Sequence, residues 1–297
     1  MTKVIIIGLG AVGLTYAVQL REKCDLYILA DEQRIEKYKT HKPVFNGKEQ
    51  DFTYILPTDK FDADLIIITT KMNGLKSAIN SIKNFVSPKT RIISLINGIS
   101  SEKIISESYP EAKILKSYFI GHSAVRDGNN VTQDGTGTIV MEHDDFTEMF
   151  FAKSGINYSV PKDIDYAMWL KFSLNVFSNQ VSAILDMNFG GLKRNKHFIE
   201  FAKKITAEVR LIAKKEGIKN LENLEKDAID ALNIAIDEGK TSMHQDMLAK
   251  RPTEVDIFAG EIIRLGKKYG IPTPYNQTLY DLVKIKEEDN EYSIHTC

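Results

Sequence analysis

The sequence predicts an α/β protein in which a doubly wound parallel sheet at the N-terminal side precedes an all-α C-terminal domain. Three observations support this prediction. A glycine-rich turn follows an apolar strand at residues 3–13, strand-like runs alternate with helical patterns through the first half, and after residue 163 a 3.6-residue periodicity takes over. We therefore expect a Rossmann-type dinucleotide-binding domain over residues 1–162 and a helical substrate domain over residues 163–297.

The glycine-rich turn lies in the segment KVIIIGLGAVG, residues 3–13. A buried strand is expected over 4–7 and a helix over 14–20. In the pattern G-x-G-x-x-G the first glycine allows a tight bend, the second lets the backbone approach a pyrophosphate, and the third lets helix and strand pack closely. The predicted cofactor-binding residues of the turn are Gly8, Leu9, Gly10, Ala11, Val12 and Gly13. Such a turn can also be a plain loop, but its strand and helix favour dinucleotide binding.

Apolar runs define the other elements of the first half. Strands are expected at 26–30, 63–70, 91–96, 113–120 and 137–141, with an edge strand at 157–160. A helix is expected over 74–86 and a turn over 127–130. Continuous apolar strands separated by helices are typical of a parallel sheet that is covered on both faces.

Helical periodicity dominates the second half. Helices are expected at 164–186, 194–216, 221–238, 254–269 and 275–288. Gly217, Gly239 and Gly270 lie where these helices should end. We expect the domain boundary near residues 159–164 and the active cleft between the two halves.

The composition excludes several classes of protein. The 297 residues include 39 Lys and Arg and 40 Asp and Glu, for a net charge of −1, so neither nucleic acid nor a membrane surface is an expected partner. Cys24 and Cys297 predict no disulfide framework and no zinc site, and His122 and His244 lack metal-site spacing and are expected to be structural or peripheral. No apolar run could span a membrane and no signal peptide is apparent, so a soluble cytoplasmic protein is expected. The sequence leaves open whether it is a monomer or a homodimer.

One predicted helix carries an unusual set of polar residues. Residues 166–185 contain a single charged side chain, Lys171, and Asn175 and Asn179 follow it at i+4 and i+8 on the same side of the helix. A polar stripe can simply face solvent, but a solvated helix face usually carries several charges. A role in a cleft is favoured, because ionisable groups in apolar settings tend to mark functional sites.

Three further positions carry candidate site residues. Lys71 and Asn97 follow neighbouring parallel strands, and ligands bind at the carboxyl edge of such sheets. The alternatives are a surface lysine and an ordinary Asn-Gly turn. Glu254 is expected in the first turn of the 254–269 helix, after Thr253 as the N-cap, where its ordinary role is to complement the helix dipole.

Taken in order, these segments resemble the ketopantoate reductase family, whose members are 2-dehydropantoate 2-reductases. The motifs are GLGAVG, TTK at Lys71, LINGI at Asn97, KFSLNVFSN from Lys171, TSM at Ser242 and PTEVD at Glu254. They occur in the family's order and approximate spacing over essentially the whole chain. The resemblance implies a Rossmann domain, a helical C-terminal domain and the NADPH-dependent reduction of 2-dehydropantoate to (R)-pantoate for coenzyme A precursor synthesis.

The resemblance also implies roles for residues of the second half. Lys171 resembles the general acid that donates a proton to the ketone oxygen as hydride arrives at its carbon. Glu254 resembles the glutamate that orients the substrate through its hydroxyl group. Asn175 and Asn179 resemble substrate-binding amides, and Ser242 resembles the hydroxyl that contacts the substrate carboxylate.

For the cofactor end of the cleft, the resemblance points to Lys71 and Asn97, with Asn97 also close to the reacting carbonyl. A neutral amide can donate to an oxygen that gains negative charge. Where the family commonly has an arginine that grips the 2′-phosphate of NADPH, this sequence has Asp31, and an acid there ordinarily binds the ribose hydroxyl of NAD. Arg34 or Lys37 can supply a cation from the following helix. The family implies NADP(H), and NAD(H) stays open because of Asp31.

Two departures from the family pattern bear on the substrate. Thr241 stands where serine is frequent, and Gly239 stands where asparagine is frequent. The expected partner is a small-molecule 2-oxo acid, and a reductase of another 2-oxo acid on the same scaffold is the nearest alternative. A dinucleotide-sensing protein without chemistry is a further alternative, although a sensor needs none of the polar residues of the helical half.

Overall fold

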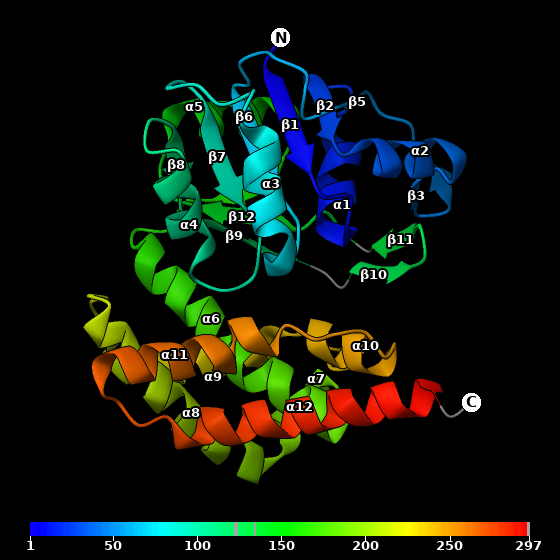
Figure 1. The fold of residues 1–297 in the computed structure, drawn as a ribbon. Coiled ribbons are helices and arrows are strands. Elements are labelled where there is room, and N and C mark those ends of the chain that lie inside the picture. The colour runs from blue at the N-terminus through cyan, green and yellow to red at the C-terminus, as the bar shows by residue number, and fades with distance from the viewer. Residues whose placement is uncertain (122–123, 134, 296–297) are drawn as a thin grey trace. The chain divides into compact units, whose positions relative to one another are not determined.

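The computed structural model describes residues 1–121, 124–133 and 135–295 and divides the chain into two compact units. The first unit is Met1–Ile164, and the second begins at Asp165. The first contains three sheets and their helices, and the second is helical (Figure 1). Two residues named above, His122 and Cys297, lie outside the described residues.

A six-stranded parallel sheet forms the middle of the first unit, in the strand order β5-β2-β1-β6-β7-β8. Its strands are β1 (Lys3–Ile7), β2 (Asp25–Leu29), β5 (Tyr54–Ile55), β6 (Leu65–Ile68), β7 (Arg91–Ser94) and β8 (Lys113–Leu115). From β1 the chain builds outward through β2 to β5 and then returns to build outward through β6 in the other direction. This is the order of a doubly wound dinucleotide-binding fold, so the predicted Rossmann-type sheet is confirmed.

Side chains of β1 alternate between two apolar cores, one on each face of the sheet. Ile6 is buried in the core that contains Leu14, whereas Ile5 is buried in the core that contains Leu75. The helices of this unit are α1 (Ala11–Leu20), α2 (Glu32–Thr40), α3 (Leu75–Ile82), α4 (Ser101–Ser108) and α5 (Asp145–Ser154), with a 3₁₀ turn η1 (Met72–Gly74). Because both faces are covered, the central strands are continuous apolar runs.

Two smaller sheets accompany the large one. A four-stranded sheet has the order β10-β11-β3-β4, with β3 (Val44–Phe45), β4 (Lys48–Glu49), β10 (Ala124–Asp127) and β11 (Asn130–Gln133). A three-stranded sheet has the order β13-β12-β9, with β9 (Ser117–Ile120), β12 (Thr138–Met141) and β13 (Tyr158–Ser159). The predicted turn at 127–130 joins β10 to β11, and the predicted edge strand is β13, so both predictions are confirmed.

The predicted strand 113–120 is wrong, because the chain changes sheets at Lys116. Residues before it form β8 of the parallel sheet, and residues after it form β9 of the three-stranded sheet. Ser117 explains the break: its hydroxyl accepts from Ser94 N at 3.2 Å and donates to Ser94 O at 3.1 Å, in place of a backbone partner. The sequence analysis also missed β3, β4, β5, β10, β11, α4 and α5.

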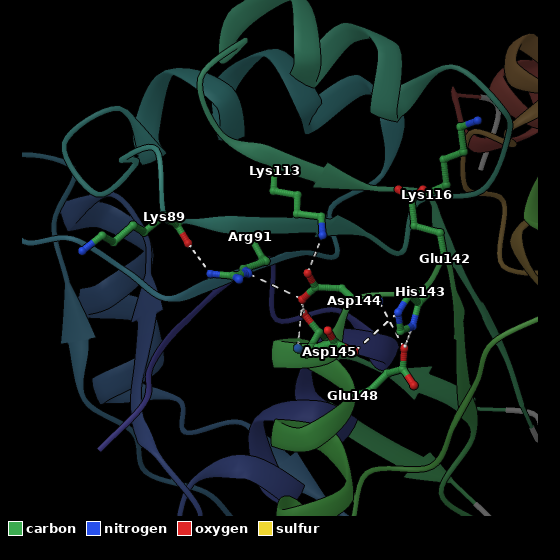
Figure 2. Close-up of polar contacts among 10 residues, drawn as sticks. Lys89, Arg91, Lys113, Lys116, Glu142, His143, Asp144, Asp145 and Glu148 are labelled. Atoms are coloured by element: carbon green, nitrogen blue, oxygen red, sulfur yellow. Dashed lines mark hydrogen bonds and ion pairs between the residues drawn. The ribbon is translucent and has the colours of Figure 1, made fainter.

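A buried carboxylate, Asp144, connects the amino ends of β7 and β8 to α5 (Figure 2). It accepts from Thr147 N at 2.9 Å, and it pairs with Lys113 Nζ at 2.6 Å and with Arg91 Nε at 3.5 Å. Burial acts to raise the pKa of Asp144, but hydrogen bonds from Lys113 and Thr147 outweigh burial and lower that pKa to about 2. Since Arg91 and Lys113 begin their strands, the cluster lies at the edge of the sheet away from the strands' carboxyl ends, and its role is structural.

The second unit consists of helices. They are α6 (Ile164–Leu185), α7 (Phe189–Arg194), α8 (Lys196–Lys215), η2 (Leu221–Asn223), α9 (Leu224–Ile234), α10 (Ser242–Leu248), η3 (Val255–Ile257), α11 (Ala259–Tyr269) and α12 (Pro274–His295). The predicted all-α character of this half is confirmed. Gly270 ends α11 in the left-handed conformation, with φ of 65°, as a helix-terminating glycine does.

Three predicted helix boundaries need correction. The helix predicted over 221–238 ends at Ile234, and the helix predicted over 275–288 continues to His295. α7 and α10 were not predicted. The helix predicted over 254–269 begins as the 3₁₀ turn η3 and becomes α-helical only at Ala259, because Phe258 has the non-helical angles φ −103° and ψ −93°. Thr253 is therefore not the N-cap of an α-helix, and Glu254 does not lie in the first turn of one. No helix in the described part of the chain is long and apolar enough to cross a membrane.

Candidate active site

The first unit places three predicted site segments at one edge of the parallel sheet. The glycine-rich turn follows β1, Lys71 follows β6, and Asn97 follows β7, and these three strands are neighbours in the sheet. The order in which strands are added to the sheet reverses between the parallel strands β1 and β6, and ligands of doubly wound folds bind at that point, outside the carboxyl ends of the strands. The edge is tightly built, since Thr69 N donates to Ile7 O at 3.0 Å and Leu95 N donates to Ile68 O at 2.8 Å.

Two glycines of the turn are required by space. A Cβ on Gly8, whose φ is +104°, would lie 2.9 Å from the backbone carbon of Thr69, and a Cβ on Gly13 would lie 1.9 Å from Gly8 O. Gly10 differs, because its nearest such neighbour is Thr69 O at 4.0 Å. Space is therefore open at Gly10, where a pyrophosphate must approach the backbone.

The start of α1 suits an anion. Gly10 is its N-cap and contributes no side chain, and the first turn contains no acidic residue. The first amide groups of a helix have no partner within the helix, and the helix dipole adds positive potential there. Leu9 is buried in the apolar core beneath α1, and Ala11 and Val12 pack against the same core, so these contacts fix the position of the turn. These residues fit the diphosphate of a dinucleotide.

Asp31 and Arg34 lie together after β2. Asp31 is the N-cap of α2, and its Oδ1 accepts from Arg34 N at 2.7 Å. Its Oδ2 lies 3.6 Å from Arg34 Nε, and both side chains are more than half exposed. A carboxylate that can accept from a ribose hydroxyl and a guanidinium that can bind a phosphate are therefore adjacent, so charge at this position does not by itself choose between NAD and NADP.

Lys71 and Asn97 occupy loop positions with defined backbones. Lys71 precedes η1 in an extended conformation, and its carbonyl accepts from Gly74 N at 2.9 Å. Asn97 is half-buried and is followed by Gly98, whose φ of 104° favours glycine. Both residues lie at the carboxyl edge of the sheet, where their strands end.

In the second unit, Lys171 lies in the first half of α6 and is half-buried. Burial lowers the pKa of its amine to about 8. No charged group in the described part of the chain offsets this effect of burial on the pKa. The amine forms no hydrogen bond or ion pair with the described residues.

Asn175, Asn179 and Ser242 form one hydrogen-bonded line. Asn179 Nδ2 donates to Asn175 Oδ1 at 3.2 Å, and Ser242 Oγ donates to Asn179 Oδ1 at 3.0 Å. Asn179 Oδ1 also accepts from Met243 N at 3.2 Å. Both asparagines are buried. The structure thus joins three predicted site residues from α6 and α10, beginning one helical turn after Lys171.

Glu254 lies in the segment between α10 and α11, immediately before η3, and its carbonyl accepts from Ile257 N at 3.1 Å. The preceding residue is held by α12, since Thr253 N donates to Glu287 Oε1 at 2.7 Å. The position of Glu254 is therefore set by the contact between this segment and α12, rather than by the start of a helix.

Sequence reasoning missed a polar pair beside this line. His244, expected to be structural or peripheral, is 2% exposed, and its Nε2 lies 2.5 Å from Asp186 Oδ1. Thr241 caps α10 by accepting from His244 N at 3.2 Å, and its Oγ1 is 2.5 Å from Ser182 Oγ. The one available signal in the sequence was Thr241, because a threonine is a favourable N-cap and marks the start of a helix at Ser242.

Comparison with known proteins identifies the family. Residues 4–145 match the family described as ketopantoate reductase PanE/ApbA, and residues 163–287 match the ketopantoate reductase PanE/ApbA C-terminal family. The chain belongs to the ketopantoate reductase family. As a member of that family it is an oxidoreductase, which confirms the predicted class of enzyme.

Relatives match over nearly their full length. The chain is 27% identical to the 2-dehydropantoate 2-reductase of Streptococcus pyogenes serotype M6, with 96% of this chain and 97% of the relative covered. It is 27% identical to the 2-dehydropantoate 2-reductase of Lactococcus lactis subsp. lactis, with 96% and 98% covered. A solved structure of D-mandelate dehydrogenase with NADH and anilino(oxo)acetate is 27% identical, with a TM-score of 0.84 and with 97% and 99% covered.

Proposed function

We propose that this chain reduces a 2-oxo acid to a 2-hydroxy acid with a nicotinamide dinucleotide, and that the substrate is 2-dehydropantoate, which yields (R)-pantoate. The setting of Lys171 carries the proposal: its half-buried amine, with a pKa of about 8, lies one helical turn before the hydrogen-bonded Asn175 and Asn179. Such an amine is mostly protonated at neutral pH and releases its proton more readily than an ordinary lysine. We place the reaction in the cytoplasm, in pantothenate and coenzyme A synthesis.

In the proposed mechanism, Lys171 holds a proton at Nζ and donates it to the ketone oxygen as negative charge develops there. The reduced nicotinamide, when bound, supplies the hydride. Asn175, Asn179 and Ser242 bind and orient the substrate, and Glu254 orients it through its hydroxyl group. Lys171 then regains a proton from solvent. General acid catalysis of this kind contributes roughly 10²–10⁴-fold to the rate.

For the cofactor, we propose that the protein discriminates only weakly between NADPH and NADH. Asp31 and Arg34 lie within 3.6 Å of each other, so a 2′-phosphate would approach both a guanidinium and a carboxylate. The family favours NADPH, whereas the carboxylate favours the ribose hydroxyl of NADH. The glycine turn and the start of α1 are expected to hold the diphosphate of either cofactor, with Lys71 and Asn97 near its nicotinamide end.

A second candidate is the reduction of a different bulky 2-oxo acid with NADH. It is supported by the D-mandelate dehydrogenase structure, which is as similar in sequence as the 2-dehydropantoate 2-reductases, at 27%. Thr241 directly precedes Ser242 and Gly239 lies three residues before it, so these two departures from the family pattern bear on substrate preference.

The test is a panel of kcat/KM values for 2-dehydropantoate, phenylglyoxylate and a branched aliphatic 2-oxo acid, each with NADPH and with NADH. The first proposal predicts the highest value for 2-dehydropantoate. A higher value for phenylglyoxylate would support the second candidate instead. Dinucleotide binding without turnover of any 2-oxo acid would contradict both and support the sensing alternative.

A further inference from the structure

The C-terminal end of α6 is joined to α10 by a buried histidine and an aspartate. His244 Nε2 lies 2.5 Å from Asp186 Oδ1, and the histidine ring is almost fully buried. The other ring nitrogen, Nδ1, is buried and has no hydrogen-bond partner among the described residues. Nε2 is therefore the ring atom through which His244 is oriented.

The backbone of Asp186 gives an independent reason to regard this pair as specific. Asp186 follows the last residue of α6 with φ of 54°, in the left-handed region, and Met187 N donates to Ser182 O at 3.1 Å to close the helix end. Glycine is the usual residue at this position because a Cβ is disfavoured there. Aspartate tolerates this conformation better than most residues other than glycine, and here its carboxylate also contacts His244.

Helix α6 also carries Asn175 and Asn179, which form a hydrogen-bonded line with Ser242 of α10. His244 is two residues after Ser242, whose hydroxyl donates to Asn179 Oδ1, and Asn179 lies on α6 seven residues before Asp186, which directly follows α6. Seven helical residues span about 10 Å. The start of α10 is thus attached to α6 and to the residue that follows α6 through three side chains: Asn179, Ser182, whose Oγ lies 2.5 Å from Thr241 Oγ1, and Asp186. The contacts of Asn179 and Ser182 hold residues 241–243, and the Asp186 contact adds a constraint farther along α10, at His244, which limits the rotation of this short helix.

We propose that His244 and Asp186 are positioning residues, which hold the Ser242 hydroxyl in the orientation that binds the substrate carboxylate. This inference rests on the proposed function, because it takes Ser242 as a substrate-binding residue. A helix of seven residues has little stability of its own, so its orientation depends on such contacts. Neither positioning residue takes part in the chemical step.

The experiment compares two variants of Asp186. D186N keeps an oxygen that can accept from His244, whereas D186G removes it, and both remove the negative charge near Lys240 and Lys286. Glycine also suits the left-handed backbone, so we expect D186G to have an unchanged or higher Tm. We expect D186G to raise the KM for the 2-oxo acid about tenfold, the size of effect produced by loss of one hydrogen bond, with kcat within about twofold. D186N should stay within about twofold in KM.

A second pair of variants tests the histidine. H244Q places an amide nitrogen near the position of Nε2, so its KM for the 2-oxo acid should stay nearly normal. H244L fills similar space without a donor and should behave like D186G. A double variant, H244L with D186G, should be no worse than either single variant, because both remove one interaction. The matched control is E225Q, which weakens the 2.6 Å ion pair of Arg210 with Glu225 between α8 and α9 and should leave KM unchanged.

The outcomes are distinguishable. Equal KM values in D186G, D186N and the unmodified protein would overturn the inference, as would a fall in kcat with KM unchanged. A lower Tm of D186G with normal KM would show a purely structural pair and would overturn it as well. If the unmodified protein turns over no 2-oxo acid, the proposed function fails first, before any of these variants is compared.

Discussion

Replacing Lys171 by methionine should make the protein less active and more stable at the same time. Burial lowers the pKa of this lysine from 10.5 to about 8, so keeping the ammonium partly out of water costs free energy in the folded state. Each unit of pKa corresponds to about 1.4 kcal/mol, so the full penalty is roughly 3 kcal/mol, and partial exposure of the side chain reduces it to roughly 1–3 kcal/mol. Methionine keeps the stem and removes this penalty.

The gain in folding stability expected for K171M depends on pH in a definite direction. Below about pH 8 both the folded and the unfolded protein bind the proton, and the whole penalty is present. Between about pH 8 and 10.5 the unfolded state binds more protons than the folded state, so the stability of the unmodified protein rises with pH. The advantage of K171M should therefore be greatest near neutral pH and vanish above 10.5.

The assay is denaturant unfolding of both proteins at three pH values, combined with steady-state kinetics. We expect kcat of K171M to fall by roughly 10²–10⁴-fold while dinucleotide affinity is unchanged, and kcat of the unmodified protein to fall as pH rises through about 8. K171R, which keeps a charge of much higher pKa, is the matched control and should remain slow. A K171M variant with near-normal kcat would refute the general-acid role, and one that is less stable near neutral pH would refute the burial argument.

Three further predictions concern Asp31, Glu254 and Asp144. D31R should raise the ratio of kcat/KM for NADPH to that for NADH, because the carboxylate beside Arg34 is replaced by a second cation; strong NADPH preference in the unmodified protein would show that Arg34 outweighs Asp31. E254A should lower kcat/KM for the 2-oxo acid with dinucleotide affinity intact, and normal turnover would exclude a substrate role. D144N should destabilise the protein by about 2 kcal/mol near neutral pH, and because the pKa of Asp144 is lowered from 3.8 to about 2, urea unfolding should show this difference disappearing as pH falls through about 2.

The elements that the sequence predicted well are those encoded locally. The glycine turn, the central parallel strands and the long α6 follow from short-range patterns, because burial on both faces or on one stripe dictates the residue types. The asparagine pair was likewise predictable, since Asn175 and Asn179 are one helical turn apart and the structure joins their amides at 3.2 Å.

The elements that were missed depend on contacts between distant segments. The strand break at Lys116 follows from Ser117 bonding to Ser94, 23 residues away. α10 has no long apolar stripe of its own, and it is anchored by contacts to α6 from residues 58 to 64 positions distant. The start of α11 depends on the backbone of Phe258, which no cap signal in the sequence marks. Local patterns cannot report such contacts, so His244 was expected only to be structural or peripheral and Glu254 was expected in the first turn of a helix.

The most direct test of the proposed chemistry follows the hydride and the proton donor together. The protein is incubated with 2-dehydropantoate and a reduced dinucleotide deuterated at the transferable position of nicotinamide C4, and the product is examined by mass spectrometry and NMR. The account predicts one deuterium at C2 of (R)-pantoate with the unmodified protein, and formation of this product at least about 10²-fold more slowly with K171M. Product without deuterium at C2, or equal rates of labelled product in both proteins, would contradict the account.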